Sequence, residues 1–293
     1  MRQRILALVA VLLALAPAPA SAWGDYAHRQ TARIAAANVS PQVRAKIRAL
    51  LARERELGTP DCPLATIEDA SVWADCVRRE SWRWGYTAAW HYRTAPICKP
   101  FDPKANCAGG NCVTAQIVRS HRILADERLP AAIRLEALAL MVHFAGDVHM
   151  PLHSGDNDDQ GGNARRAAYG IKPGLNLHWI WDGPLAERAI SDPADPVVRR
   201  YSSAERAEMA GGTPDDWGRE SWEIARSFVY PTAFDTDDVC ASPLPAEATL
   251  SQDDIARAVP IARRRVVEAG LRIAVLLESA FAPGPLVPDA PRR

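Results

Sequence analysis

The sequence lacks several features that define other classes of protein. A membrane-spanning helix needs about 20 apolar residues, and neither the apolar run at Ile5–Ala16 nor any later segment reaches that length. No basic run is present, and 35 Lys and Arg balance 35 Asp and Glu. A protein that attracts nucleic acid by its overall charge would be basic. If the protein binds a phosphodiester, the positive charge that attracts it must therefore be concentrated at one site, and bound metal ions could supply it.

The first 22 residues have the pattern of a secretory signal peptide. Arg2 and Arg4 precede the apolar run, and Ala20–Ala22 has the small residues of a cleavage site. We therefore expect an exported protein, periplasmic or secreted, with a signal peptide at 1–22 and one domain at 23–282. Cleavage would free the amine of Trp23, which could then chelate a metal together with its own carbonyl oxygen.

The chain shows mainly helical patterns, few strand signals, no internal repeat and no domain linker. We expect a single-domain, disulfide-braced bundle of helices over residues 41–55, 64–79, 113–127, 130–149, 215–229 and 251–281. Ser40 and Pro41 form a helix start, and Pro260 is expected to kink the last helix or mark its start. Residues 154–175, rich in Gly, Asp and Asn, predict an ordered loop over the site. The tail at 283–293 is rich in proline.

All six cysteines lie after the signal peptide. An even count in an exported chain favours disulfides. Cys107 and Cys112 are separated by a flexible Ala-Gly-Gly-Asn segment that could close on itself. A zinc knuckle is the alternative at this segment, and the residues alone leave the other pairs open.

Two histidines are each followed, four residues later, by an aspartate, in the pairs His143–Asp147 and His178–Asp182. On a helix such residues share one face, and His153 lies between the two pairs. His143 in its apolar helix could be a packed core histidine, but Asp147 would then be a buried carboxylate, which is costly unless it is paired. A metal ion resolves both difficulties.

Asp75 raises the same question, since apolar residues surround it. His91, between Trp90 and Tyr92, would alone be explained by packing. Of the remaining histidines, His121 is expected to be solvated and His149 to end a helix.

Taken together, these motifs resemble the zinc site of the S1/P1 nuclease family, whose architecture the zinc phospholipases C of the same superfamily share. The resemblance covers most of residues 23–282, in the family's order. It rests on Trp23-Gly-Asp-Tyr-Ala-His28, Trp73-Ala-Asp75-Cys-Val-Arg78, His91-Tyr92, His143-Phe-Ala-Gly-Asp147, Pro151-Leu-His153, Asp159-Gln-Gly-Gly-Asn163, Asn176-Leu-His178 and Trp181-Asp182.

The resemblance implies three Zn²⁺ ions and assigns their ligands. It gives the first ion Asp75, His91, His143 and Asp147. It gives the second ion His153, His178 and Asp182, with positions left for water or substrate. It gives the third ion the Trp23 amine and carbonyl, His28 and Asp147, so that Asp147 bridges two ions. Imidazole nitrogen and carboxylate oxygen are ordinary zinc ligands.

The resemblance also implies the chemistry. An activated water attacks phosphorus in line, Asp75 orients it, and the third ion stabilises the departing 3′-oxygen. Single-stranded DNA and RNA would yield 5′-phosphate products, and 3′-nucleotides would lose their phosphate. The ions exceed the three carboxylates by roughly three positive charges, which favours an anionic ester in a neutral protein. We expect a monomer without membrane attachment.

Three residues match family positions near the substrate. Arg78 matches an arginine that contacts phosphate, with an ordinary surface arginine as the alternative. Asn163 matches an asparagine near the phosphate. Tyr92 occupies the position of an aromatic that stacks on an unpaired base, with a core tyrosine as the alternative. Gln160 departs from the pattern, since many members have a basic residue there.

The resemblance further implies the disulfides Cys98–Cys240 and Cys107–Cys112. Cys62 and Cys76, which are additional to the family's two bridges, remain as a third pair.

Two other functions fit parts of the pattern. A zinc phospholipase C would have the same ions and a lipid phosphodiester as substrate, but Asp182 in place of Glu and the Gly-Gly-Asn163 loop favour a nuclease. A zinc-storing or structural module would close its sites with four protein ligands, whereas the third ion here would have only Trp23, His28 and Asp147.

Overall fold

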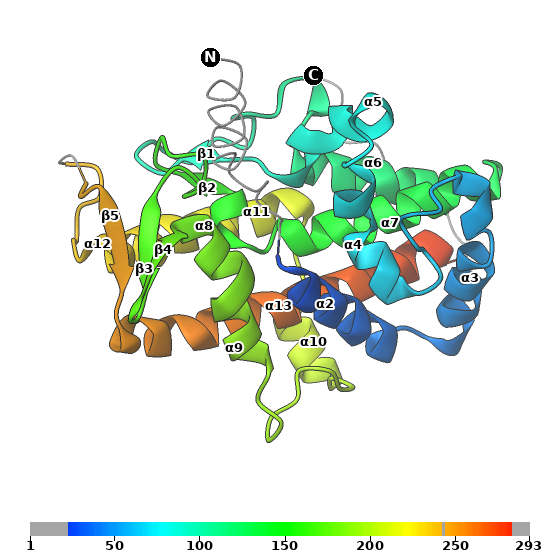
Figure 1. Cartoon of the computed structure of the whole chain (residues 1–293). Coiled ribbons are helices and arrows are strands. Elements are labelled where there is room, and N and C mark those ends of the chain that lie inside the picture. Colours follow the sequence, from blue (N-terminus) through cyan, green and yellow to red (C-terminus); the bar gives the residue numbers. More distant parts are fainter. Residues whose placement is uncertain (1–22, 242–243, 283–293) are drawn as a thin grey trace, which may run out of the picture.

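The computed structural model describes residues 23–241 and 244–282, and this part of the chain is mainly helical, as the sequence predicts (Figure 1). The predicted signal peptide at 1–22 and the tail at 283–293 lie outside the described residues. The α-helices are α2 (Asp25–Asn38), α3 (Pro41–Leu51), α4 (Ile67–Val77), α5 (Ser81–Trp84), α6 (Val113–Ala125), α7 (Ala131–Asp147), α8 (Leu177–Ile180), α9 (Ala186–Ile190), α10 (Ser203–Met209), α11 (Pro214–Ile224), α12 (Tyr230–Phe234) and α13 (Gln252–Phe281).

Short helical turns connect several of these helices and carry part of the site. The 3₁₀ turns are η1 (Glu54–Leu57), η2 (Gly85–His91), η3 (Ala108–Gly110) and η4 (Pro151–His153), and the π turns are η5 (Trp181–Leu185) and η6 (Ala225–Val229). The π turn η5 continues α8, and such turns are frequent at functional sites.

Helix α7 is the central helix of the fold. Its part from Ala137 to Asp147 is apolar on nearly all sides, and every residue in it is buried. A helix without a polar face has to be covered all round, and α2, α3, α4, α6 and α13 pack against it. The polar residues at its C-terminal end, His143 and Asp147, are therefore held inside the protein.

Side-chain caps fix where the helices around α7 begin. Ser40 accepts a hydrogen bond from the Val43 amide, with Pro41 at the first helical position, as predicted. Thr66 and Asp69 form a capping box that starts α4. Another capping box, at Ser251, starts α13 at Gln252, so Pro260 lies inside this helix, and of the two predicted alternatives the one that it marks the helix start is wrong.

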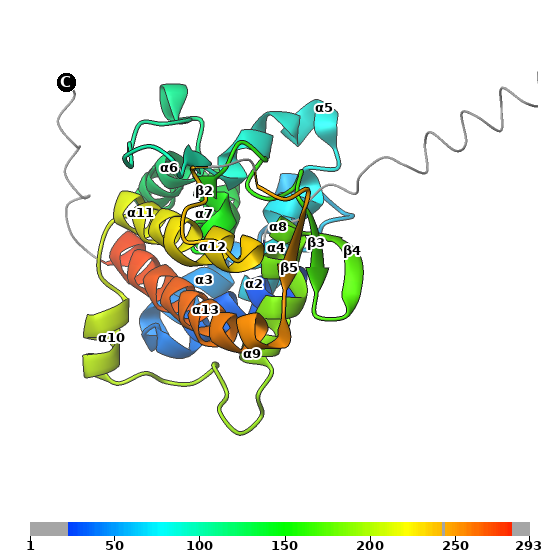
Figure 2. The ribbon, with the colours of Figure 1, turned by 90° about the vertical axis from the view of Figure 1, so that its left-hand side faces the viewer.

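Two small sheets complete the fold. Strands β1 (Ala95–Pro96) and β2 (Gly155–Asp156) pair in parallel. The other sheet has the order β4-β3-β5, formed by β3 (Arg166–Tyr169), β4 (Lys172–Asn176) and β5 (Glu247–Leu250). It lies at one end of the molecule, with α3 at the opposite end, and α13 extends between the two (Figures 1 and 2).

Two buried apolar clusters fill the interior. One lies among α3, α4, α6 and α7, and the other lies among α8, α9, α11, α12 and the three-stranded sheet. Helices α2 and α13 contribute residues to both clusters. The C-terminal end of α7 and the turn η4 lie where the clusters meet.

Three disulfides brace the loops. They are Cys98–Cys240 and Cys107–Cys112, which the family resemblance implies, and Cys62–Cys76, the pair that remained. Because Cys107 and Cys112 bond to each other, the zinc-knuckle alternative is wrong. Cys76 lies next to Asp75, so its bridge to Cys62 braces the helix that carries this aspartate.

Candidate metal centre and substrate cleft

The candidate ligands come from different elements that converge on the C-terminal end of α7. Within the described residues, three groups of side chains are close enough to hold a metal ion. They are His28, His143 and Asp147; Asp75, His91 and His143; and His153, His178 and Asp182.

Asp147 lies at the centre of the first two groups and is fully buried. Its Oδ1 atom lies 3.1 Å from Nε2 of His28 on α2. Its Oδ2 atom lies 3.1 Å from Nδ1 of His91 and 3.2 Å from Nε2 of His143. One carboxylate is therefore within reach of three imidazoles, which is the arrangement that a bridging ligand requires.

Asp75 of α4 faces two of the same imidazoles. Its Oδ1 atom lies 3.6 Å from His91 Nδ1 and 3.9 Å from His143 Nε2. The same oxygen forms an ion pair with Nη2 of Arg78, one turn further along the chain, at 2.8 Å. Asp75 thus joins the buried group to an arginine at the rim of the cleft.

The third group lies beyond η4. His178 Nε2 is 3.0 Å from Asp182 Oδ2, and His153 Nε2 is 3.9 Å from Asp182 Oδ1. The spacing of four residues places His178 on α8 next to Asp182 on the following π turn. The two imidazoles stack with their ring centres 4.9 Å apart.

Backbone carbonyls orient three of the imidazoles. The Nδ1 atoms of His143, His153 and His178 lie 2.6–2.7 Å from the carbonyl oxygens of Ser71, His91 and Gly161, respectively. A carbonyl oxygen can only accept a hydrogen bond, so Nδ1 carries the proton. In the neutral imidazole the Nε2 atom is then free of a proton and points into its group, as a metal ligand requires.

The spacing of these atoms fits a bound cation. Ligand atoms about 2.1 Å from a tetrahedral zinc ion lie about 3.4 Å apart, and the carboxylate–imidazole distances given above are 3.0–3.9 Å. Several of the atoms are buried and, despite these short distances, form no hydrogen bond of good geometry with any described residue. They are His28 Nε2, Asp147 Oδ1, His153 Nε2 and both carboxylate oxygens of Asp182.

Electrostatics distinguishes the two buried aspartates. Burial would raise the pKa of Asp147, but His143, with further contributions from His28 and His91, holds it well below its usual value. Burial lowers the pKa of His143, but Asp147 and Asp75 outweigh this effect and raise it to about 9. At Asp182 burial prevails over the nearby His178 and raises the pKa to about 6.

Trp23 is buried, and the residue that follows it connects two of the candidate ligand groups. The amide of the next residue, Gly24, donates a 2.8 Å hydrogen bond to the carbonyl oxygen of Asp182, and the Gly24 carbonyl accepts one from the His28 amide. The start of the described chain is therefore held between the group of Asp182 and that of His28.

A cleft of about 440 Å³ opens beside the groups. His91, His153 and His178 line its floor, and Arg78, Tyr92 and Asn163 lie in its wall. Tyr92 has 43% of its surface exposed, so it is not a core tyrosine. All three residues that the resemblance placed near a substrate thus face one cavity that reaches the candidate ligands.

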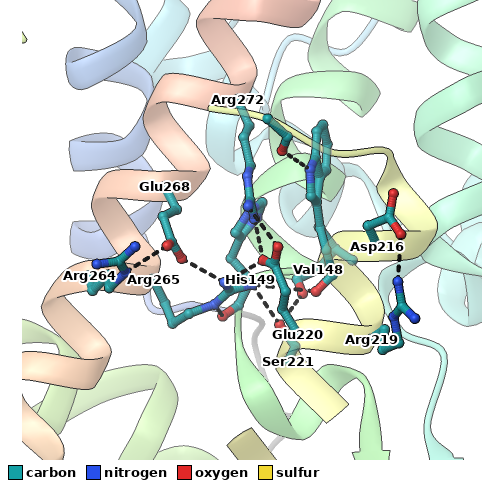
Figure 3. A network of polar contacts seen from close by, with 12 residues as sticks. Val148, His149, Asp216, Arg219, Glu220, Ser221, Arg264, Arg265, Glu268 and Arg272 are labelled. Atoms are coloured by element: carbon teal, nitrogen blue, oxygen red, sulfur yellow. Dashed lines mark hydrogen bonds and ion pairs between the residues drawn. The ribbon is translucent and has the colours of Figure 1, made fainter. Parts of the chain in front are cut away.

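A largely buried ionic network surrounds Val148 and His149, just beyond the end of α7 (Figure 3). Arg265 and Arg272 of α13 both donate to Glu220 of α11, at 2.8 Å and 2.6–2.9 Å. Arg272 also lies 2.9 Å from Nε2 of the buried His149, and Arg265 donates to the His149 carbonyl oxygen at 3.3 Å. The network therefore fixes the turn between α7 and η4, which connects Asp147 to His153.

The comparison with known families agrees with this geometry. The sequence pattern of the S1/P1 nuclease family matches residues 23–282. The chain belongs to the S1/P1 nuclease family. It is therefore a nuclease, a hydrolytic enzyme, as the sequence predicts.

Individual S1/P1 nucleases are similar over much of this chain. Nuclease S1 from Aspergillus oryzae is 25% identical over 293 residues, which cover 94% of this chain and 97% of that protein. Endonuclease 3 from Arabidopsis thaliana is 24% identical, with 88% and 89% covered. Nuclease P1 from Penicillium citrinum is 28% identical over 178 residues, 59% of this chain and 61% of that protein.

Some residues of the site were not found from the sequence. Asp156, Asp158 and Thr94 also line the cleft, and Arg29 and Arg79 line a second cavity beyond Arg78. None of them lies in a recognisable motif, because their proximity depends on the fold.

Among the described residues, no helix is both long and apolar enough to cross a membrane.

Proposed function

We propose that this chain is an exported zinc-dependent endonuclease. It hydrolyses single-stranded DNA and RNA to products with 5′-phosphates, and it removes the phosphate of 3′-nucleotides. The observation that carries the proposal is the position of Asp147, whose buried carboxylate lies within 3.2 Å of three imidazoles beside an open cleft.

Three zinc ions fit the donor set. Asp75, His91, His143 and Asp147 would hold one, and His153, His178 and Asp182 a second. The Trp23 amine and carbonyl would hold a third with His28 and Asp147. All donors are nitrogen or oxygen, since the six cysteines form disulfides. When bound, zinc acts as a Lewis acid and lowers the pKa of a coordinated water to about 7.

The side chains around the ions have separate roles in this proposal. Asp75 orients the attacking water through its carboxylate. Arg78, whose guanidinium contacts Asp75 at 2.8 Å, binds a non-bridging oxygen of the phosphate at the rim. Because Asp75 fixes one side of the guanidinium, its remaining N–H groups are oriented before the substrate arrives.

The wall of the cleft binds the nucleoside. The half-exposed ring of Tyr92 stacks on an unpaired base, and the side chain of Asn163 lies near the phosphate. The Asn163 amide donates to the Gln160 carbonyl at 3.0 Å, which holds it in the wall. Stacking accepts any base but requires an unpaired one, so single strands are favoured.

The zinc phospholipase C alternative is not favoured. The relatives reported above carry the names of nucleases, and the matched family is one of nucleases. Assays with single-stranded DNA and with phosphatidylcholine, run on the same zinc-loaded protein, separate the two functions directly.

Asp147→Asn tests the central observation. An amide binds zinc more weakly than a carboxylate, so this variant is expected to lose metal from two groups and to lose hydrolysis of single-stranded DNA. Metal analysis by mass spectrometry and a hydrolysis assay check this. Asp253→Asn, at the exposed start of α13, is the control. Near wild-type hydrolysis by Asp147→Asn would contradict the proposal.

The N-terminus provides a second test. A protein that begins at Trp23 is compared with one that carries an additional residue before it. The extended protein is expected to contain one zinc ion fewer and to hydrolyse single-stranded DNA more slowly, because the additional residue converts the amine into an amide.

Export is consistent with the three disulfides, which form outside the reducing cytosol. Every ligand group comes from one chain, so a monomer suffices.

A further inference from the structure

A second cavity opens on the other side of Arg78 from the cleft. Its volume is about 570 Å³, within the size range of ligand sites. Helices α2 and α4 form two of its walls, and Ala88 of η2 closes it. We call this cavity the arginine groove, because Arg29, Arg78 and Arg79 all line it.

The arginine groove is continuous with the candidate centre. Arg78 lines both cavities, His91 lines the cleft and Asp75 lines the groove. Since Asp75 and His91 belong to the same candidate metal group, this group lies between the two cavities. A strand whose scissile phosphate lies at this group therefore extends into the cleft on one side and into the groove on the other.

The charges of the groove suit a phosphate chain. Arg79 is exposed, and none of the described residues forms an ion pair with it. Arg29 is 35% exposed and contacts Asp69 at 3.0 Å, which leaves part of its guanidinium facing the groove. The carboxylates in the lining are Asp25 and Asp75, and Asp75 is already paired with Arg78.

We propose that the arginine groove is a second nucleotide subsite, which binds the strand on the 3′ side of the scissile phosphate. Arg29 and Arg79 contact the next phosphates of that strand. This rests on the proposed function. A 3′-nucleotide has a nucleoside only on the 5′ side of its phosphate, and that nucleoside occupies the cleft beside Tyr92. The groove consequently binds the nucleotides on the 3′ side of the scissile phosphate, so longer strands bind more tightly than short ones.

The test compares a thymidine dinucleotide, which has only the scissile phosphate, with a longer oligothymidylate. Arg79→Ala and Arg29→Ala are each expected to raise KM for the oligothymidylate about two- to fivefold. The kcat values and the KM for the dinucleotide stay unchanged. Each variant also lowers the slope of log KM against log salt concentration by about 0.7, the value for one phosphate contact on a single strand. Arg79→Lys retains the charge and most of the affinity.

Arg33→Ala is the matched control. Arg33 lies one turn after Arg29 on α2 and pairs with Glu68, the neighbour of Asp69, at 3.5 Å, but it does not line the groove. Its substitution is expected to leave both KM values unchanged. Equal effects on the dinucleotide and the oligothymidylate, or no effect on either, would overturn the subsite. A wild-type protein that hydrolyses neither substrate would instead refute the proposed nuclease activity, and the subsite with it.

Discussion

The imidazole of His28 lies directly against the backbone of Gly146. A β-carbon at position 146 would stand 2.7 Å from Nδ1 and 2.8 Å from Cε1 of His28, closer than real contacts allow. Gly146 precedes Asp147 on α7, so the absence of a side chain lets His28 approach the carboxylate.

Gly146→Ala is therefore expected to displace His28 from Asp147. Alanine favours a helix interior over glycine by about 1 kcal/mol, so a loss of function cannot come from helix propensity. We expect reduced zinc content and at least a tenfold lower kcat. Metal analysis and hydrolysis of single-stranded DNA check this. Gly211→Ala, where nothing lies within 4 Å of the new carbon, is the control, and equal behaviour of the two variants would contradict the explanation.

Tyr92→Ala is expected to weaken binding of single strands and leave zinc content unchanged. Loss of one stacked base corresponds to about 1–3 kcal/mol, seen as a higher KM for single-stranded DNA. Tyr86→Ala is the control, since Tyr86 is 59% exposed but does not line the cleft. If Tyr92→Ala instead loses zinc, the ring supports the centre by packing and does not bind a base.

Asp182 gives the metal-free protein a pH-dependent stability. Its pKa is raised by burial, from 3.8 to about 6. Because this pKa is raised in the folded state, the contribution of Asp182 to the free energy of unfolding is fully present below pH 4 and is lost as the pH rises through 6. The shift corresponds to about 3 kcal/mol.

Urea unfolding of zinc-free wild type and Asp182→Asn, followed between pH 4 and 7, measures this contribution. The stability of the wild type relative to the variant is expected to fall over this interval. A constant difference between the two proteins would show that Asp182 does not titrate there.

Glu220→Gln removes the carboxylate that Arg265 and Arg272 share. Breaking a buried ion pair from one side costs about 3–5 kcal/mol. Because Glu220 is 38% exposed, we expect about 2 kcal/mol, measured by urea unfolding. Glu208→Gln, in an exposed pair with Arg264, is expected to change stability by less than about 0.5 kcal/mol. Similar losses in both variants would mean that burial of the network is unimportant.

The long helices could be predicted because their signals are local. The prediction of 130–149 became Ala131–Asp147, and that of 251–281 became Gln252–Phe281. Helix α2 was not predicted. The expected loop at 154–175 contains the strands β2 and β3 and most of β4, and β3 pairs with the distant β5. Such pairing depends on contacts far apart in the sequence, which local patterns do not contain.

The same limit applies to single residues. His121 was expected to be solvated, and this is wrong. It is buried, and its Nε2 atom lies 2.8 Å from the Ser279 hydroxyl of α13. The candidate ligands were found because each lies in a short motif. Arg29 and Arg79 have ordinary neighbours in the sequence, and only the packing of α2 against α4 brings them to one groove.

The segment between the bridged Cys98 and Cys240 contains the five candidate ligands from His143 to Asp182. The exposed segment at 191–196 lies inside this span and is an accessible point for a protease. A chain cut there would remain one molecule, since the sulfur–sulfur bond tethers the two fragments. It would migrate as an intact band in a non-reducing gel and as two bands after reduction, so a proteolytic cut need not separate the halves of the enzyme.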